Sequence, residues 1–213
     1  MEIIWYGHAC FRLREKGITI ITDPYDKSLG YTLPRLRADV VTSSHPAPGH
    51  AHVSAIRGDP KVLNGPGEYE IRGIFITGIP TWHAHKRGQP DERNTVFLFD
   101  FNGISVCHLG DLGHVLSEDQ VEAIGEVGVL LIPVGGGRTL DASRASEVIS
   151  QLEPRIVIPM HYKTPTCACK LDKIDKFLRA MGISSVETRD ALKLSASQLP
   201  DETQVVLLDY KQG

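Results

Sequence analysis

The chain has 213 residues, of which 41% are hydrophobic and 23% are charged, as in an ordinary soluble globular protein. This length suits one domain, and we expect residues 1–213 to form a single hydrophobic core. The formal net charge of -3 offers no excess of positive charge to a polyanion, so we expect no nucleic-acid partner.

The start of the chain and its cysteines indicate where the protein works. Residues 1–6 lack a basic start and a long apolar run, and predict a first strand rather than a signal peptide. No apolar run approaches the ~18 residues that a membrane span needs. Four cysteines are too few for a disulfide framework. We therefore expect a cytoplasmic protein without a membrane partner.

The first half of the chain predicts strands separated by Gly, Pro and Asp. These strands are expected over residues 2–6, 9–13, 18–22, 40–43, 62–64 and 74–80. Residues 65–69, Gly-Pro-Gly-Glu-Tyr, predict a rigid turn. Residues 95–99 and 104–107 flank an Asn-Gly pair, which predicts a β-hairpin.

The second half predicts helices that alternate with strands. Ser117 with Gln120 three residues later is the pattern of a capping box at a helix start. Further helices are expected over 142–152 and 172–181, and strands over 129–134, 156–160 and 205–208. The natural packing is a layered α/β sandwich.

Five of the apolar runs lead into a histidine or an aspartate. These residues are Asp23, His45, His83, Asp111 and His161. Strands that are distant in sequence but all end in metal-type ligands indicate one shared site along the rim of a sheet. Imidazole and carboxylate suit a divalent ion, which lowers the pKa of water toward neutrality. A single histidine alone is more often a surface or core residue than a ligand.

The motifs around these residues resemble a known family. They are Thr22-Asp23-Pro24, Ser44-His45-x-x-x-x-His50, Thr81-Trp82-His83, His108-Leu109-Gly110-Asp111 and Met160-His161-Tyr162. In this order they resemble the metallo-β-lactamase superfamily, specifically its branch of lactonase-like, UlaG-type hydrolases. The resemblance implies an αββα sandwich, with two mixed sheets flanked by helices and metal at one edge between the sheets.

The resemblance also implies a ligand set, which is incomplete. The family's His-x-His-x-Asp-His motif aligns with His45, Ala47, Gly49 and His50, so two ligands are missing. By resemblance, His45 and His83 belong to one metal position, His50 and His161 to a second, and Asp111 bridges them. We expect one divalent ion rather than two, zinc first, with manganese or iron as alternatives. Asp111 and His161 are the residues expected to act in catalysis.

Other residues have two interpretations each. Asp23 either positions the histidine loop or is a turn residue before Pro24. Arg138, after three glycines, either holds an anionic substrate group or belongs to a tight turn, and Lys163 either contacts substrate or is an ordinary strand-end lysine. Among the remaining histidines, His52 and His85 are candidate substitute ligands or exposed loop residues. Structural roles are expected for His8, His108 and His114.

Two functions remain open from the sequence. The first is a metal-dependent hydrolase of an ester, lactone or phosphoester bond in a small substrate. The second, which Ala47 and Gly49 favour, is a binding or assembly module that keeps the fold without turnover. The mildly acidic charge disfavours a nuclease. A homo-oligomer is compatible with either function.

Overall fold

The computed structural model describes residues 1–83, 92–101 and 103–213. Its first sheet has six strands in the order β13-β1-β2-β3-β4-β5. The strands that precede β3 in this order pair antiparallel, whereas β3, β4 and β5 run parallel. Their bounds are β1 Glu2–Trp5, β2 Phe11–Glu15, β3 Ile18–Thr22, β4 Val40–Thr42, β5 Lys61–Leu63 and β13 Leu192–Lys193.

The second sheet has seven strands in the order β14-β11-β10-β9-β8-β7-β6. The half from β14 to β9 is parallel, and the half from β9 to β6 is antiparallel. Its strands are β6 Gly67–Ile71, β7 Ile74–Trp82, β8 Arg93–Asp100, β9 Ser105–His108, β10 Val129–Pro133, β11 Ile156–Met160 and β14 Gln204–Val205. Two short strands, β12 Thr188–Arg189 and β15 Leu207–Leu208, form a separate parallel pair.

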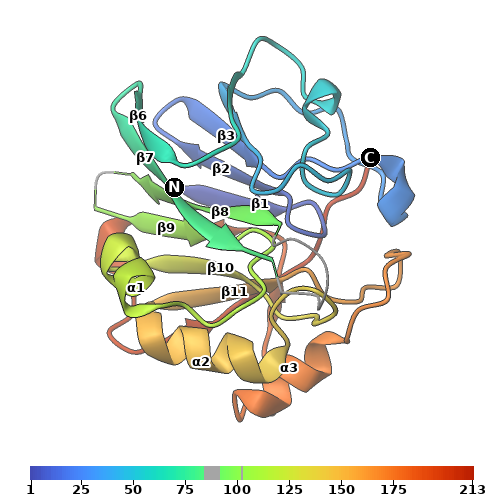
Figure 1. Ribbon diagram of the computed structural model, residues 1–213, viewed down its shortest axis with the longest axis vertical. Coiled ribbons are helices and arrows are strands. Elements are labelled where there is room, and N and C mark those ends of the chain that lie inside the picture. The colour runs from blue at the N-terminus through green and yellow to red at the C-terminus, as the bar shows by residue number, and fades with distance from the viewer. Residues whose placement is uncertain (84–91, 102) are drawn as a thin grey trace.

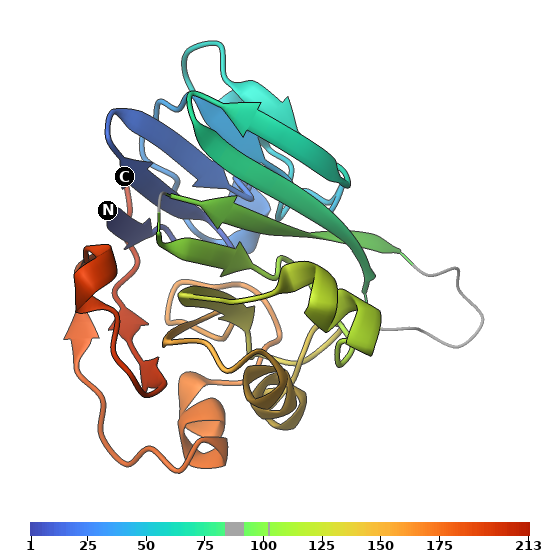
Figure 2. The ribbon, with the colours of Figure 1, turned by 90° about the vertical axis from the view of Figure 1, so that its left-hand side faces the viewer.

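The three α-helices of the described residues lie on the side of the second sheet that faces away from the first sheet (Figures 1 and 2). They are α1 Glu118–Ile124, α2 Ala142–Leu152 and α3 Ile174–Ala180. Helix α1 begins with the capping box that the sequence predicts, because the side chains of Ser117 and Gln120 each bind the other residue's backbone N–H. Helix α2 buries Ala145, Val148 and Leu152 against the core.

The main core lies between the two sheets and continues between the second sheet and the helices. Residues alternate between buried and partly exposed along β1 and β2, so Ile3, Trp5, Phe11 and Leu13 all enter this core. A smaller cluster on the other face of the first sheet joins Ile21 and Val41 to loop residues such as Tyr31. The 3-10 helices η1 Lys27–Leu29 and η2 Val53–Ala55 lie in these loops, and η3 Ala196–Gln198 lies near the C-terminus. The predicted fold of two mixed sheets with α-helices is confirmed.

Two expectations from the sequence are wrong in detail. Residues 67–71 form the edge strand β6 rather than only a turn, because they pair with β7 from Gly67↔Gly78 to Ile71↔Ile74. The expected strand over 205–208 is two pieces, since β14 pairs with β11 whereas β15 pairs with β12. The β8–β9 hairpin is confirmed, with Asp100 opposite Ser105. Among the described residues, no helix has the length and apolar character needed to span a membrane.

The strand directions bring the predicted site residues to one edge of the molecule. β3 and β4 are parallel neighbours in the first sheet, and β9, β10 and β11 are parallel neighbours in the second. The carboxyl ends of parallel strands meet at the same edge of a sheet. Both sheets present such an edge to the same region, where the loops after these strands converge.

Candidate metal centre

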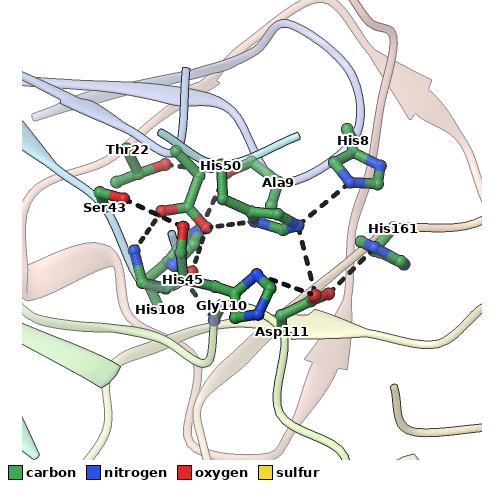
Figure 3. A network of polar contacts seen from close by, with 12 residues as sticks. His8, Ala9, Thr22, Ser43, His45, His50, His108, Gly110, Asp111 and His161 are labelled. Carbon is green, nitrogen blue, oxygen red and sulfur yellow. Dashed lines mark hydrogen bonds and ion pairs between the residues drawn. The ribbon is translucent and has the colours of Figure 1, made fainter. Parts of the chain in front are cut away.

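Asp111 is the centre of the cluster that the sequence predicts. Its Oδ2 lies 3.4 Å from Nε2 of His50 and 4.0 Å from Nδ1 of His45, and it contacts Nε2 of His83. Its Oδ1 lies 3.1 Å from Nε2 of His161. Figure 3 shows His50, His161 and His45 around this carboxylate. All five predicted ligands are buried and meet in one place.

The backbone around Asp111 is fixed by a residue that the sequence analysis missed. The backbone N–H of Asp111 donates to Oδ1 of Asn94 at 2.8 Å. The amide nitrogen of the same Asn94 donates to the Leu109 carbonyl at 3.0 Å and to Oγ1 of Thr81 at 2.7 Å. Asn94 is completely buried and lies on β8, next to both β7 and β9. Its side chain therefore ties the strand before His83 to the loop that carries Asp111.

Asp23 lies behind His50, on the side away from Asp111. Its Oδ2 lies 2.8 Å from Nδ1 of His50, and its Oδ1 accepts the Ser44 backbone N–H at 2.8 Å. The Ser44 hydroxyl donates to Oδ2 of Asp23. This arrangement leaves Nε2 of His50 directed at Asp111, as expected when a carboxylate fixes the orientation of a metal-binding imidazole.

His8 also joins the cluster, although the sequence analysis assigned it a structural role. Its Nε2 lies 3.2 Å from Nε2 of His50, and its ring centroid lies 4.0 Å from that of His161. His108 matches the structural expectation, because its Nε2 contacts the Ala9 carbonyl at 2.8 Å. His114 makes a comparable contact, with its Nδ1 at 2.8 Å from the Val115 carbonyl.

Glu92 is a second acidic residue at the site that the sequence analysis missed. It lies opposite His83 at the start of the β7–β8 pair, where the His83 N–H donates to the Glu92 carbonyl at 2.9 Å. Its Oε2 lies 3.2 Å from Nε2 of His45, and its Oε1 lies 3.0 Å from Nη2 of Arg138. The cross-strand position of residue 92 relative to His83 is the signal that could have identified it.

The donor atoms form two groups that suit a divalent ion. His8, His50 and His161 form one group and His45, His83 and Glu92 the other, with donor atoms within 4.8 Å of one another in each. Three buried imidazole nitrogens of the cluster lack a hydrogen-bond partner among the described residues: Nδ1 of His8, His45 and His161. Imidazole nitrogens and carboxylate oxygens in this combination fit zinc and related ions.

The cluster shifts the ionisation of its own members. Burial alone would raise the pKa of Asp111, but His50 and His161 hold that pKa well below its usual value. Burial lowers the pKa of His50, but Asp111 and Asp23 outweigh burial and raise it to about 9. Burial, reinforced by His161 and His50, holds the pKa of His8 well below its usual value. Without an ion, the centre therefore contains a charged carboxylate and a neutral His8 imidazole.

Three backbone positions of the cluster adopt left-handed conformations that are rare outside glycine. The φ angles are 52° at His8, 41° at Asp23 and 52° at His161. Such backbone strain persists only where the surrounding structure enforces it, and it concentrates at functional sites. Three of the six described non-glycine residues with positive φ thus belong to this one cluster.

A cavity of about 290 Å³ opens above the cluster. Besides the histidines and Asp111, it is lined by Ala47, Gly49, Leu29, Leu171, Gly136, Thr139 and Arg138. Lys163, expected as a substrate contact, does not line it, because its Nζ is bound by the carbonyls of Cys167 and Cys169. His52 is exposed and belongs to neither donor group, and His85 lies outside the described residues.

Comparison with known proteins identifies the family. Residues 2–161 match the family described as Beta-lactamase superfamily domain, so the chain belongs to this family. Among solved structures, the fold is similar to a Thermotoga maritima protein provisionally named a Zn-dependent hydrolase of the metallo-β-lactamase superfamily. That similarity has a TM-score of 0.82 and 41% identity, and it covers 99% of each chain.

Two curated relatives carry UPF0173 names, and one of these names includes metal-dependent hydrolase. A UPF0173 metal-dependent hydrolase from Carboxydothermus hydrogenoformans is 25% identical over 217 residues, covering 86% of this chain and 95% of that protein. A UPF0173 protein from Pyrococcus abyssi is 29% identical over 180 residues, covering 77% of this chain and 84% of that protein. The relatives thus resemble this chain over most of their length.

Proposed function

We propose that this protein is a metal-dependent hydrolase that cleaves an ester, lactone or phosphoester bond in a small substrate. The observation that carries the proposal is the convergence of four histidines on the buried carboxylate of Asp111. The names of the relatives support it, since two of the proteins compared above are called hydrolases that depend on a metal or on zinc. Within the superfamily we assign the chain to the UlaG-type branch.

The cofactor we propose is a divalent ion, with zinc first and manganese or iron as alternatives. His45, His83 and Asp111 would hold it, and three protein ligands are the usual number for a catalytic zinc. The bound ion supplies a Lewis acid that polarises the scissile group and lowers the pKa of water. The sequence alone favoured one ion because Ala47 and Gly49 cannot act as ligands.

The chain's own residues position the substrate and the protons. Nδ1 of His83 lies 3.0 Å from the Arg138 carbonyl, which leaves Nε2 of His83 facing Asp111. Asp23 orients His50 in the same way. We propose that Asp111 and His161 act in catalysis. Both line the cavity, and their side chains are close enough to exchange a proton with each other or with a bound substrate.

The cavity supports a small substrate with an anionic group. Arg138 lines it together with Gly136, and its half-exposed guanidinium pairs with Glu92. Leu29 and Leu171 offer apolar contacts in the same cavity. A guanidinium pairs well with a carboxylate or phosphate. We propose that Arg138 binds the anionic group of the substrate.

We also propose that neither nucleic acid nor a membrane is a partner of this protein.

The remaining expectations are carried forward as proposals. We propose one domain over residues 1–213, because the main core contains residues from Ile3 to Leu208. We propose a cytoplasmic location, because all four cysteines are free. A homo-oligomer is compatible with the site, which a single chain completes.

An experiment can decide between hydrolysis and the alternative of a binding module, which Ala47 and Gly49 favour. Protein purified without chelator is analysed for metal and then assayed on ester, lactone and phosphodiester substrates after loading with zinc, manganese or iron. We expect bound metal and turnover, both lost in Asp111→Asn and kept in His52→Ala. A protein that binds metal but turns over nothing supports the module, and one that binds no metal overturns the proposal.

A further inference from the structure

The imidazole of His8 lies next to Gly49, where a side chain at position 49 would begin. A Cβ atom built on Gly49 would lie 3.1 Å from Nε2 of His8 and 3.5 Å from its Cδ2. The backbone of Gly49 does not have a positive φ, so it does not itself require glycine. The space that a side chain at position 49 would enter is therefore occupied by His8.

His8 is held in this place by its backbone. Its carbonyl accepts the Trp5 indole N–H at 3.0 Å and the His161 backbone N–H at 3.1 Å. The second bond joins the turn after β1 directly to the turn after β11, which carries His161. The side chain is only 4% exposed and its Nδ1 has no partner among the described residues. His8 is therefore a buried imidazole whose strained backbone is held in place by the surrounding structure, as is typical of functional sites.

The distances around His50 fit a shared ion. Two ligands of a tetrahedral zinc, each about 2.0–2.1 Å from the ion, lie roughly 3.3 Å apart. Nε2 of His50 lies 3.2 Å from Nε2 of His8 and 3.4 Å from Oδ2 of Asp111. Oδ1 of Asp111 lies 3.1 Å from Nε2 of His161. Figure 3 shows these four side chains directed at one another.

We propose that His8 is a metal ligand in place of the side chain that Gly49 lacks. His8, His50, His161 and Asp111 then form one position for a divalent ion, and His45, His83 and Asp111 form a second beside it. The protein accordingly binds two ions. This inference rests on the proposed function, since it assumes that the Asp111 cluster binds metal.

Glu92 lies beside the other position. Its Oε2 is 3.2 Å from Nε2 of His45, and the donor atoms of His45, His83 and Glu92 lie within 4.8 Å of one another. The two positions differ in exposure, because the Glu92 side chain is 40% exposed and pairs with Arg138, whereas His8 is buried. A catalytic ion needs an open coordination place. The His45 position is therefore the one that faces the substrate.

Exchanging the two residues tests the inference. His8→Gly removes the imidazole and suits the φ of 52° at this position. In His8→Gly/Gly49→Asp, an aspartate can enter the space that the imidazole has left. Gly49→Asp alone leaves His8 in place, and His52→Ala is a matched control at an exposed histidine near the motif.

The readouts are the zinc content after loading and desalting, and the visible absorption of the cobalt-substituted protein. We expect two ions per chain in the unaltered protein and in His52→Ala, one in His8→Gly, and two again in His8→Gly/Gly49→Asp. The cobalt absorption should fall and recover in the same order. Circular dichroism of the metal-free variants establishes that each has folded.

Three results would overturn the inference while leaving the proposed hydrolase in place. The first is a single ion in the unaltered protein, and the second is two ions retained in a folded His8→Gly protein. If the exchange variant regains no ion although His8→Gly loses one, His8 does not stand in for position 49, and the inference fails in that form. Failure to bind any ion would overturn the proposed function itself.

Discussion

Nδ1 of His50 lies 2.8 Å from Oδ2 of Asp23, a carboxylate with no exposed surface that also accepts two hydrogen bonds from Ser44. Asp23 follows the last residue of β3, and Ser44 follows β4, the parallel neighbour of β3. The contact therefore fixes an imidazole of the cluster to the edge of the first sheet. A buried ring oriented in this way has only its other nitrogen free to bind an ion.

Asp23→Asn is expected to weaken zinc binding by about 10- to 100-fold, because outer carboxylates of metal-binding histidines have effects of this size. The asparagine keeps the volume of the side chain but loses its charge and one acceptor for His50 and Ser44. Competition with a chelating dye measures the affinity. Asp59→Asn, at an exposed residue, is the control and should bind zinc as the unaltered protein does. Equal affinity in both variants would show that Asp23 does not act on the metal.

Arg138→Gln is expected to raise the KM for an anionic substrate by about 10-fold or more. A hydrogen bond to a charged group contributes roughly 1.5–3 kcal/mol, which corresponds to that range. The KM for a neutral ester of similar size should change little, because the apolar contacts remain. Arg179→Gln, on the exposed face of α3, serves as the control. A parallel loss for both substrates would indicate a general change of the cavity instead.

Gly135→Ala is expected to destabilise the protein by about 2 kcal/mol or more, because overpacking of a dense interior has costs of this order. A Cβ at position 135 would lie 2.2 Å from the His161 carbonyl oxygen and 2.9 Å from Cα of Tyr162, so backbone would have to move. Urea unfolding measures the free energy of unfolding.

Gly65→Ala is the matched control for this experiment. Neither glycine has a positive φ, and a Cβ at Gly65 would meet no atom within 4 Å. The free energy of unfolding should then change by less than about 0.5 kcal/mol. Similar losses at both positions would mean that the close approach of the His161 turn is not the cause.

Local patterns were sufficient for much of the fold. The capping box at Ser117, the β8–β9 hairpin and helix α2 each depend on residues that are near one another in sequence. The edge strand β6 was missed because the Gly-Pro pair directly before it resembles a turn. Pairing with β7 keeps β6 extended.

The candidate site was only partly predictable, because some of its residues come together through contacts between distant segments. Strand-end positions identified His45, His83 and Asp111, since a metal-type residue after an apolar run is visible in the sequence. Glu92 lacks that signal. His8 follows the apolar run of residues 3–6 by two positions, but it was assigned a structural role. His8 reaches the cluster through a turn bonded to the backbone of His161, and Glu92 through its pairing with His83. These are contacts between distant segments, which no local pattern encodes.

The loop after β11 carries a thiol whose ionisation can be tested independently of the metal. The Cys169 side chain and its backbone N–H, together with Tyr31 and Lys163, outweigh burial and lower the pKa of Cys167 to about 6. The Cys169 N–H donates to Sγ of Cys167 at 3.1 Å. These groups favour the charged form, so Cys167 should be a thiolate above pH 6 and a thiol below it.

The thiolate absorbs near 240 nm, and the difference in absorbance between the unaltered protein and Cys167→Ser isolates its titration. In chelated protein we expect a midpoint near pH 6, well below the ~8.5 of an ordinary cysteine. Cys169→Ala removes the thiol partner and should move the midpoint upward, whereas Cys169→Ser keeps a hydroxyl donor and should move it less. A midpoint above pH 8 in the unaltered protein would mean that the loop does not stabilise the thiolate.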